Sequence, residues 1–158
     1  MDSLIVFGAK YLFLFVLLGA VVPLFVMHRD ERKGYVLTSI FAAILAFVFA
    51  KSAGALYFDP RPFTHGVHAL IPHEPDNGFP SDHTTLSFVA SVLVLRFSKP
   101  IAMGLVSLAA IVGVCRVLSG VHSPIDILGG AIFGSVASIV ASTIVNRLTL
   151  SPRTEATA

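Results

Sequence analysis

The sequence predicts an all-α, polytopic membrane helix bundle, and three observations support that prediction. Apolar residues make up 55% of the 158-residue chain and charged residues only 13%, whereas a soluble domain carries about 25% charged residues. The mean hydropathy is +0.85. The apolar residues also form long stretches separated by short polar ones. A chain of this length and composition is expected to form one domain in a lipid bilayer.

About five transmembrane helices are expected, because five apolar stretches come near the roughly 20 residues that cross a bilayer. The expected crossings are residues 11–27, 35–58, 81–97, 100–118 and 124–148. Residues 2–10 either extend the first helix or form a short interfacial helix. We expect residues 1–150 to form the single integral-membrane domain and residues 151–158 to form a flexible polar tail.

The basic residues predict how the bundle is oriented. Seven of the eleven share one side of a five-crossing topology: Arg29, Arg32, Lys33, Arg96, Lys99, Arg147 and Arg153. Cytoplasmic loops carry an excess of Lys and Arg, so this side, with the C-terminus, is expected to be cytoplasmic. The N-terminus and the long linker at residues 59–80 are then expected on the outer face. The net charge of +2 is too small to indicate a nucleic-acid partner.

Three polar segments reach this predicted outer face. They are residues 51–62 (KSAGALYFDPRP), residues 79–88 (FPSDHTTLSF) and residues 115–126 (CRVLSGVHSPID). Each lies where an expected helix ends or begins on that side of the membrane. The number of crossings therefore predicts that the three segments meet in space.

The charges and helix starts of these segments predict an anion site. Arg61 and Arg116, with Lys51 as a weaker candidate, lie on the face where topology does not favour positive charge. Arginine presents a planar donor fork that matches a phosphate. Ser81 or Asp82 can cap the helix that begins there, and free N–H groups at helix starts favour anions. One arginine alone would suggest an interfacial anchor, but the set indicates phosphate binding.

Two histidines offer a reaction at that site. Asp126 is close enough in sequence to His122 to accept a hydrogen bond from one ring nitrogen, which would leave the other nitrogen as a nucleophile. His83 could then protonate the leaving oxygen. Ser123 and Asp126 also fit a capping box, so the alternative is that Asp126 only begins a helix.

A metal site is the rival interpretation of the long linker. Its possible ligands are His65, His68, His73, Glu74 and Asp76. Their spacing as a set does not match a common zinc signature. We expect these side chains to be solvated and the reaction to need no metal or other cofactor.

Together these residues resemble the signature of the phosphatidic-acid-phosphatase type 2 superfamily of membrane phosphatases. The signature has a lysine followed by Arg-Pro, then Pro-Ser-x-His, then Ser-Arg-x5-His-x3-Asp. Here Arg61-Pro62, Pro80-Ser81-Asp82-His83 and Arg116-x5-His122-x3-Asp126 match the core of each part. The runs PRPF and HEPDNGFPSDHTT look most like the bacterial undecaprenyl-diphosphatase branch of the bacitracin-resistance type.

The resemblance implies a phosphohistidine mechanism in which His122 is the nucleophile, Asp126 orients it and His83 is the acid. The residues that would hold the phosphate are Arg61, Arg116, Ser81 and, more weakly, Lys51. The implied substrate is undecaprenyl diphosphate, a polyprenyl diphosphate lipid. Its cleavage to the monophosphate on the outer face of the plasma (inner) membrane would recycle the lipid carrier of peptidoglycan synthesis.

Three departures from the family pattern stand out. Nine residues separate Lys51 from Arg61, where the family has six, and Cys115 stands where serine is usual. Many family members have six crossings rather than five. Phosphatidic acid and phosphatidylglycerol phosphate are alternative substrates. A small membrane transporter or lipid flippase, or a non-catalytic scaffold, are alternatives of other classes.

Overall fold

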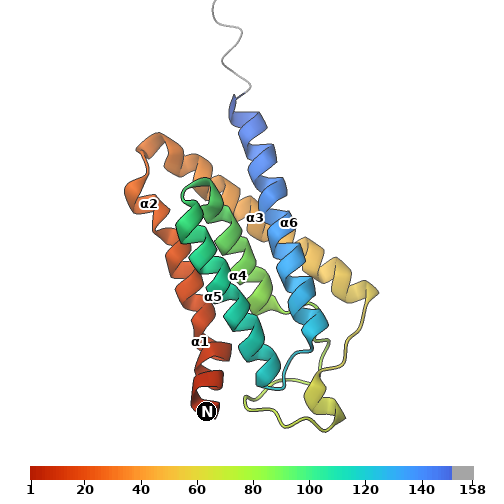
Figure 1. Ribbon diagram of the computed structural model, residues 1–158. Helices are drawn as coiled ribbons and strands as arrows, with labels where there is room; N and C mark the ends of the chain where they lie inside the picture. The colour runs from red at the N-terminus through yellow and green to blue at the C-terminus, as the bar shows by residue number, and fades with distance from the viewer. Residues whose placement is uncertain (151–158) are drawn as a thin grey trace, which may run out of the picture.

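The computed structural model describes residues 1–150, and the side chains of residues 1–148, as a bundle of helices (Figure 1). The elements are α1 (Asp2–Val21), α2 (Pro23–Val26), α3 (Arg29–Leu56), η1 (Pro62–His65), α4 (Asp82–Leu93), η2 (Val94–Arg96), α5 (Lys99–Leu118) and α6 (Pro124–Leu150). The all-α prediction is confirmed. The expected tail at residues 151–158, with Arg153, lies outside the described residues.

Four helical segments are long and apolar enough to cross a membrane, so the chain is a multi-pass membrane protein. Within the described part they are Asp2–Val26, Arg29–Leu56, Lys99–Leu118 and Pro124–Leu148. Their outward side chains are largely apolar, as lipid contact requires; Leu18, Phe47 and Leu128 are examples.

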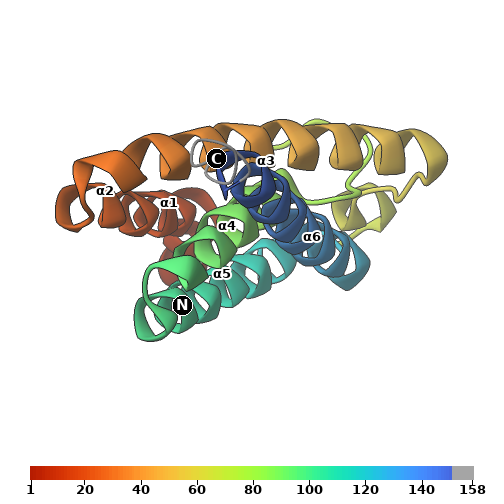
Figure 2. The same ribbon diagram turned by 90° about the horizontal axis from the view of Figure 1, so that it is seen from above.

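The expected crossing at residues 81–97 is helical from Asp82 to Arg96, but in two parts. Helix α4 has twelve residues and continues only into the three-residue turn η2. It contacts α1, α3, α5 and α6, and seen from above it lies between α3 and α5 (Figure 2). Its buried hydroxyls donate to carbonyls one turn earlier, Ser87 to His83 and Ser91 to Ser87. This enclosed helix therefore carries polar side chains without exposing them to lipid.

Of the other predicted boundaries, one agrees with an expected alternative and one changes. Residues 2–10 extend the first helix, which was one of the two expected alternatives, and Pro23 separates α1 from α2 because proline lacks the N–H that a helix interior uses. The polar residues 28–34, which fall between the first two expected crossings and were expected to connect them as a linker, instead lie largely in α3, because that helix already begins at Arg29. Asp30 and Glu31 in its first turn favour that start, because they complement the positive end of the helix dipole.

Close packing of α6 on α4 depends on small residues. A Cβ added at Gly130 would lie 2.9 Å from the carbonyl oxygen of Ser81, and one at Gly134 would collide with the carbonyl oxygen of Thr85. The Ser138 hydroxyl also donates to the carbonyl of Val89 across the interface at 3.0 Å. The backbones of the two helices therefore approach closely, as is common in lipid, and this fixes the start of α4 against the start of α6.

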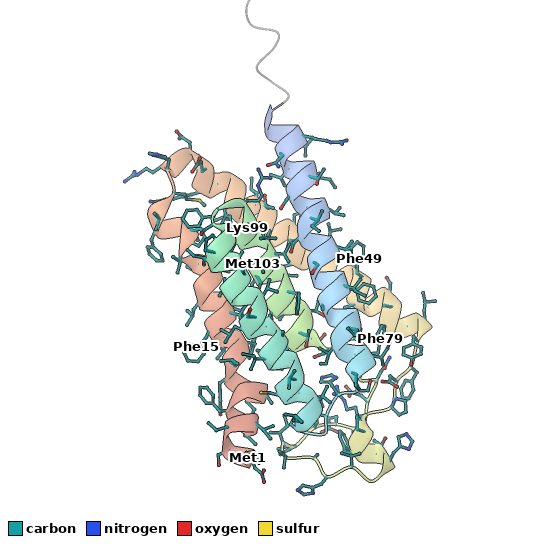
Figure 3. The ribbon with its side chains drawn as sticks, viewed as in Figure 1. Met1, Phe15, Phe49, Phe79, Lys99 and Met103 are labelled. Carbon is teal, nitrogen blue, oxygen red and sulfur yellow. The ribbon has the colours of Figure 1, made fainter. Side chains whose placement is uncertain are left out.

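The bundle has two chemically different ends. The α2–α3 and η2–α5 junctions lie at one end (Figure 1), and Figure 3 places Lys99 there. The N-terminus, the loop at residues 57–81 and the α5–α6 turn lie at the other, which is called the site end below. The three polar segments of the sequence thus meet at one end, as the number of crossings predicted.

Candidate active site

A cavity of about 330 Å³ lies at the site end. Its walls come from α3, the loop at residues 57–81, the start of α4, the end of α5 and the α5–α6 turn. Six of the eight predicted site residues line it: Lys51, Arg61, Asp82, His83, Arg116 and His122. The other two, Ser81 and Asp126, are fully buried behind the cavity wall.

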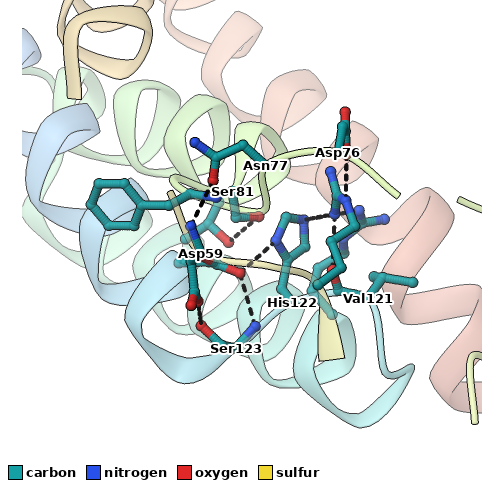
Figure 4. Close-up of polar contacts among 12 residues, drawn as sticks. Asp59, Asp76, Asn77, Ser81, Val121, His122 and Ser123 are labelled. Carbon is teal, nitrogen blue, oxygen red and sulfur yellow. Dashed lines mark hydrogen bonds and ion pairs between the residues drawn. The ribbon is translucent and has the colours of Figure 1, made fainter. Parts of the chain in front are cut away.

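The cavity holds an oriented histidine. His122 and Asp126 are both buried, and Nδ1 of His122 lies 3.1 Å from Oδ2 of Asp126 (Figure 4). The other ring nitrogen, Nε2, lies 3.1 Å from Nη2 of Arg116 and 3.4 Å from Nη1 of Arg61. A guanidinium can only donate and a carboxylate can only accept. The contacts therefore assign the proton to Nδ1 and the lone pair to Nε2, on the cavity side.

Burial lowers the pKa of His122 below its ordinary value of 6.5. The hydrogen bond to Asp126 acts to raise this pKa, whereas the positive charges of Arg116 and Arg61 lower it further. The imidazole is therefore neutral at neutral pH, so its Nε2 lone pair is available for attack on an electrophile.

We predict that the pH profile of kcat/KM has an acid limb with an apparent pKa below 6.5. As the pH falls through the lowered pKa, Nε2 takes up a proton and the nucleophile is lost. The measurement is hydrolysis by the purified protein across that range. His73 needs a control, because burial and the charges of Arg61 and Arg116 also lower its pKa. A limb above 6.5, or one that disappears in His73→Gln, would contradict the assignment to His122.

The two arginines form a buried positive pair around His122. Arg61 donates from Nη1 to the Val121 carbonyl at 2.9 Å and from Nε to Asp76 at 2.6 Å. Although burial alone would raise the pKa of Asp76, the hydrogen bond and charge of Arg61 outweigh it and lower that pKa. Arg116 donates a long bond, 3.4 Å, from Nη1 to the Ala9 carbonyl, and its Nη2 faces Nε2 of His122 at 3.1 Å.

The donors of Arg116 are incompletely used. Its Nε is buried and has no hydrogen-bond partner among the described residues. A buried cation with unpaired donors is costly unless an anion completes the site. This arrangement can hold a phosphate between two guanidiniums, with its phosphorus near Nε2 of His122.

His83 lies on the first turn of α4 and lines the same cavity as His122. Its ring packs edge-on against Phe13, with 4.5 Å between ring centres. Within residues 1–148, no hydrogen bond or ion pair engages its ring nitrogens. They are therefore available to a molecule bound in the cavity.

The remaining predicted residues of the anion site differ in placement. Ser81 occupies the N-cap position of α4, but its side chain makes no capping hydrogen bond, so that part of the prediction was wrong. Its hydroxyl accepts from Thr84 at 3.2 Å, and its N–H donates to the Asp126 carbonyl at 3.1 Å. Asp82 and Lys51 are exposed at the cavity, and the Lys51 ammonium lies 5.7 Å from the centre of the Phe47 ring.

The predicted capping box at the start of α6 is half formed. Oδ2 of Asp126 accepts from the Ser123 N–H at 2.8 Å, so this carboxylate both caps the helix and holds His122. The Ser123 hydroxyl was expected to cap the helix, but it donates instead to Oδ2 of Asp59. The two interpretations of Asp126 are therefore compatible.

The possible metal ligands of the long linker do not assemble. No three His, Cys, Asp or Glu side chains within the described residues lie together as a metal site. His65 and His68 are exposed in the loop. His73 instead lines the cavity, with its ring centre 6.3 Å from that of His122.

Sequence reasoning missed the residues that shape the loop beside the site. The side chain of Asn77 accepts from the N–H groups of Asp59 and Phe79 at 3.0 Å and donates to two carbonyls at the end of α3. Next to it, a Cβ at Gly78 would lie 2.7 Å from Oδ2 of Asp126, so the loop needs glycine there. The Asn-Gly pair, which only Phe79 separates from the Pro-Ser-x-His motif, was the available signal.

The chain is similar to a family of known proteins, and the matching region contains the whole cavity. A PAP2 superfamily model matches residues 33–150, which include every residue lining the cavity. The chain is 34% identical over 141 residues to the Bacillus licheniformis "bacitracin transport permease protein BcrC", covering 88% of this chain and 69% of that one. It is 33% identical over 133 residues to the "undecaprenyl-diphosphatase BcrC" of Bacillus subtilis (strain 168), covering 84% and 68%. Among solved structures, Aquifex aeolicus LpxE matches with a TM-score of 0.68 and 25% identity over 90% of this chain and 87% of that one.

Proposed function

The chain belongs to the PAP2 superfamily of membrane phosphatases, and on that basis we propose that it hydrolyses undecaprenyl diphosphate to undecaprenyl phosphate through a phosphohistidine at His122. One observation supports this mechanism most. The lone-pair nitrogen of His122 lies between two guanidiniums, while Asp126 holds its other nitrogen. The name of the Bacillus subtilis relative supports the choice of substrate.

In the first half-reaction, Nε2 of His122 attacks the terminal phosphorus of the diphosphate. A nitrogen–phosphorus bond forms, and the bond from that phosphorus to the bridging oxygen breaks. His83, protonated when the anionic diphosphate is bound beside it, donates that proton to the bridging oxygen, so undecaprenyl phosphate leaves. Asp126 stabilises the positive charge that develops on the imidazole.

In the second half-reaction, water attacks the phosphohistidine. His83, now without its proton, takes one from the water, and the bond between phosphorus and Nε2 breaks. Inorganic phosphate leaves, and both histidines return to their starting states. Throughout, Arg61 and Arg116 neutralise the non-bridging oxygens, which is the main electrostatic demand of phosphoryl transfer. These side chains supply the nucleophile, the acid and the positive charge, so we propose that no metal is required.

The distribution of basic residues supports an outward-facing site. Six of the seven residues expected on the cytoplasmic side lie in the described residues, at the end opposite the cavity: Arg29, Arg32, Lys33, Arg96, Lys99 and Arg147. By the positive-inside rule that end faces the cytoplasm. The cavity and the N-terminus would then face outward from the plasma (inner) membrane.

A transporter or flippase is the alternative of another class, and the name of the Bacillus licheniformis relative points to transport. Intramembrane charges often mark a transport path. Here the catalytic set gathers around one cavity at one end of the bundle, which favours chemistry on a lipid headgroup over passage through the membrane.

The test is phosphate release by purified protein from undecaprenyl diphosphate, phosphatidic acid and phosphatidylglycerol phosphate, each before and after chelation of metals. We expect undecaprenyl diphosphate to be cleaved fastest, and its cleavage to survive chelation. Faster cleavage of either glycerophospholipid would overturn the substrate assignment. Loss of activity on chelation, restored by added metal, would overturn the metal-free mechanism.

A further inference from the structure

We propose that Asp59 is a positioning residue for His122 and acts through the hydroxyl of Ser123. The proposal rests on the proposed function, in which His122 is the nucleophile. Asp59 is not one of the residues that match the three motifs of the family resemblance. It also does not line the cavity, so its effect on the reaction would be indirect.

Two side chains of one short segment hold the residues on either side of His122. Oδ2 of Asp59 accepts from the Ser123 hydroxyl, and Nη1 of Arg61 donates to the Val121 carbonyl at 2.9 Å. Asp59 and Arg61 are two residues apart in the sequence, and so are the two residues that they hold, Val121 and Ser123. Asp59 and Arg61 thus hold the turn between α5 and α6 at two points, with His122 between them (Figure 4).

The Ser123 contact continues directly to the catalytic carboxylate. The Ser123 N–H donates to Oδ2 of Asp126 at 2.8 Å, and the same oxygen lies 3.1 Å from Nδ1 of His122. A shift of Ser123 would therefore move both the acceptor that orients the imidazole and the backbone that bears it. Arg61 alone would hold the loop on one side only, because its bond is to Val121.

The backbone of Asp59 is itself held by Asn77 and Gly78, in the loop before α4. Its N–H donates to Oδ1 of Asn77 at 3.0 Å, and its carbonyl accepts from the Gly78 N–H at 2.9 Å. Asn77 in turn donates to the carbonyls of Gly54 and Tyr57 at the end of α3, both at 2.9 Å. The backbone that bears the Asp59 carboxylate is therefore held at two points, as a positioning role requires.

The experiment is a double-mutant cycle with Asp59→Ala, Ser123→Ala and the double variant, using phosphate release from undecaprenyl diphosphate. Each single change is expected to lower kcat about 10- to 100-fold with little change in KM, because misplacing a nucleophile affects the chemical step. The double variant should be no slower than the slower single variant, because both changes remove the same bond. Asp59→Asn keeps an acceptor oxygen and should recover most of the activity.

The matched control is Glu74→Ala, which removes an exposed carboxylate of the same loop without a hydrogen bond in the described structure; it should retain wild-type kcat. Thermal unfolding of every variant separates positioning from loss of fold. Single effects that multiply in the double variant, or that raise KM and leave kcat unchanged, would overturn the proposal. Failure of the proposed function is distinct: wild-type protein would not release phosphate, or His122→Ala would remain active.

Discussion

Replacing His122 with alanine is expected to lower phosphate release from undecaprenyl diphosphate by more than about 10⁴-fold, as loss of a covalent nucleophile does in other enzymes. Nε2 of His122 is the nitrogen that faces both Arg116 and Arg61, and alanine leaves nothing in its place to attack phosphorus. The measurement is single-turnover hydrolysis by variant protein whose thermal unfolding matches that of the wild type.

The control is His65→Ala, because His65 is an exposed histidine of the neighbouring loop. It should leave the rate within about twofold of wild type, as surface substitutions usually do. Substantial activity in His122→Ala, well above the uncatalysed rate, would mean that water or another side chain attacks phosphorus directly. The covalent mechanism would then be wrong.

Replacing His83 with alanine is expected to lower hydrolysis of undecaprenyl diphosphate about 10²- to 10⁴-fold, the usual contribution of a general acid. His83 lines the cavity beside His122, and its ring is supported edge-on by Phe13. The effect should depend on the leaving group. With p-nitrophenyl phosphate, whose leaving group needs no proton, phosphorylation of His122 should slow by less than about 10-fold.

The burst of p-nitrophenol before steady state isolates that first step, because hydrolysis of the phosphohistidine follows it. His68→Ala, a second exposed loop histidine, serves as the matched control and should leave both substrates unaffected. An equal loss of the burst rate and of undecaprenyl diphosphate cleavage in His83→Ala would contradict the role of acid. It would indicate instead that His83 shapes or binds within the cavity.

The convergence of three distant segments could be predicted because it depends on few quantities. The number of crossings decides which helix ends share a side of the membrane, and residues 51–62, 79–88 and 115–126 all fall at such ends. The His122–Asp126 contact could also be predicted from the sequence, because the two residues flank the start of one helix. Local spacing and membrane topology are thus sufficient for the outline of the site.

Helix lengths were harder to predict, because hydropathy alone misses two effects. Charged residues can begin a helix, and a buried helix can be short and polar. Arg29 and its charged neighbours are typical of a linker, yet they extend α3 by matching the helix dipole. Helix α4 is short and rich in hydroxyl groups because other helices enclose it. Hydropathy measures contact with lipid and carries no information about which helix is central.

The loop contacts could not have been predicted from the sequence. Asp59 and Ser123 are 64 residues apart, and Arg61 and Asp76 are 15 apart. These pairings depend on how the loop folds over the end of the bundle, and no periodicity in the sequence marks them. The residues proposed to carry out the chemistry were therefore easier to predict than the contacts that hold them in place.

The most direct test of the central claim is to trap the phosphoryl group on the enzyme. Wild-type protein and His122→Ala would be mixed with undecaprenyl diphosphate, quenched in alkali within the first turnover, and digested for mass spectrometry. We predict one phosphoryl group on His122 of the wild-type protein, formed before inorganic phosphate appears, and none in the variant. Rapid turnover with His122 unmodified, or with the phosphoryl group on another residue, would contradict the account.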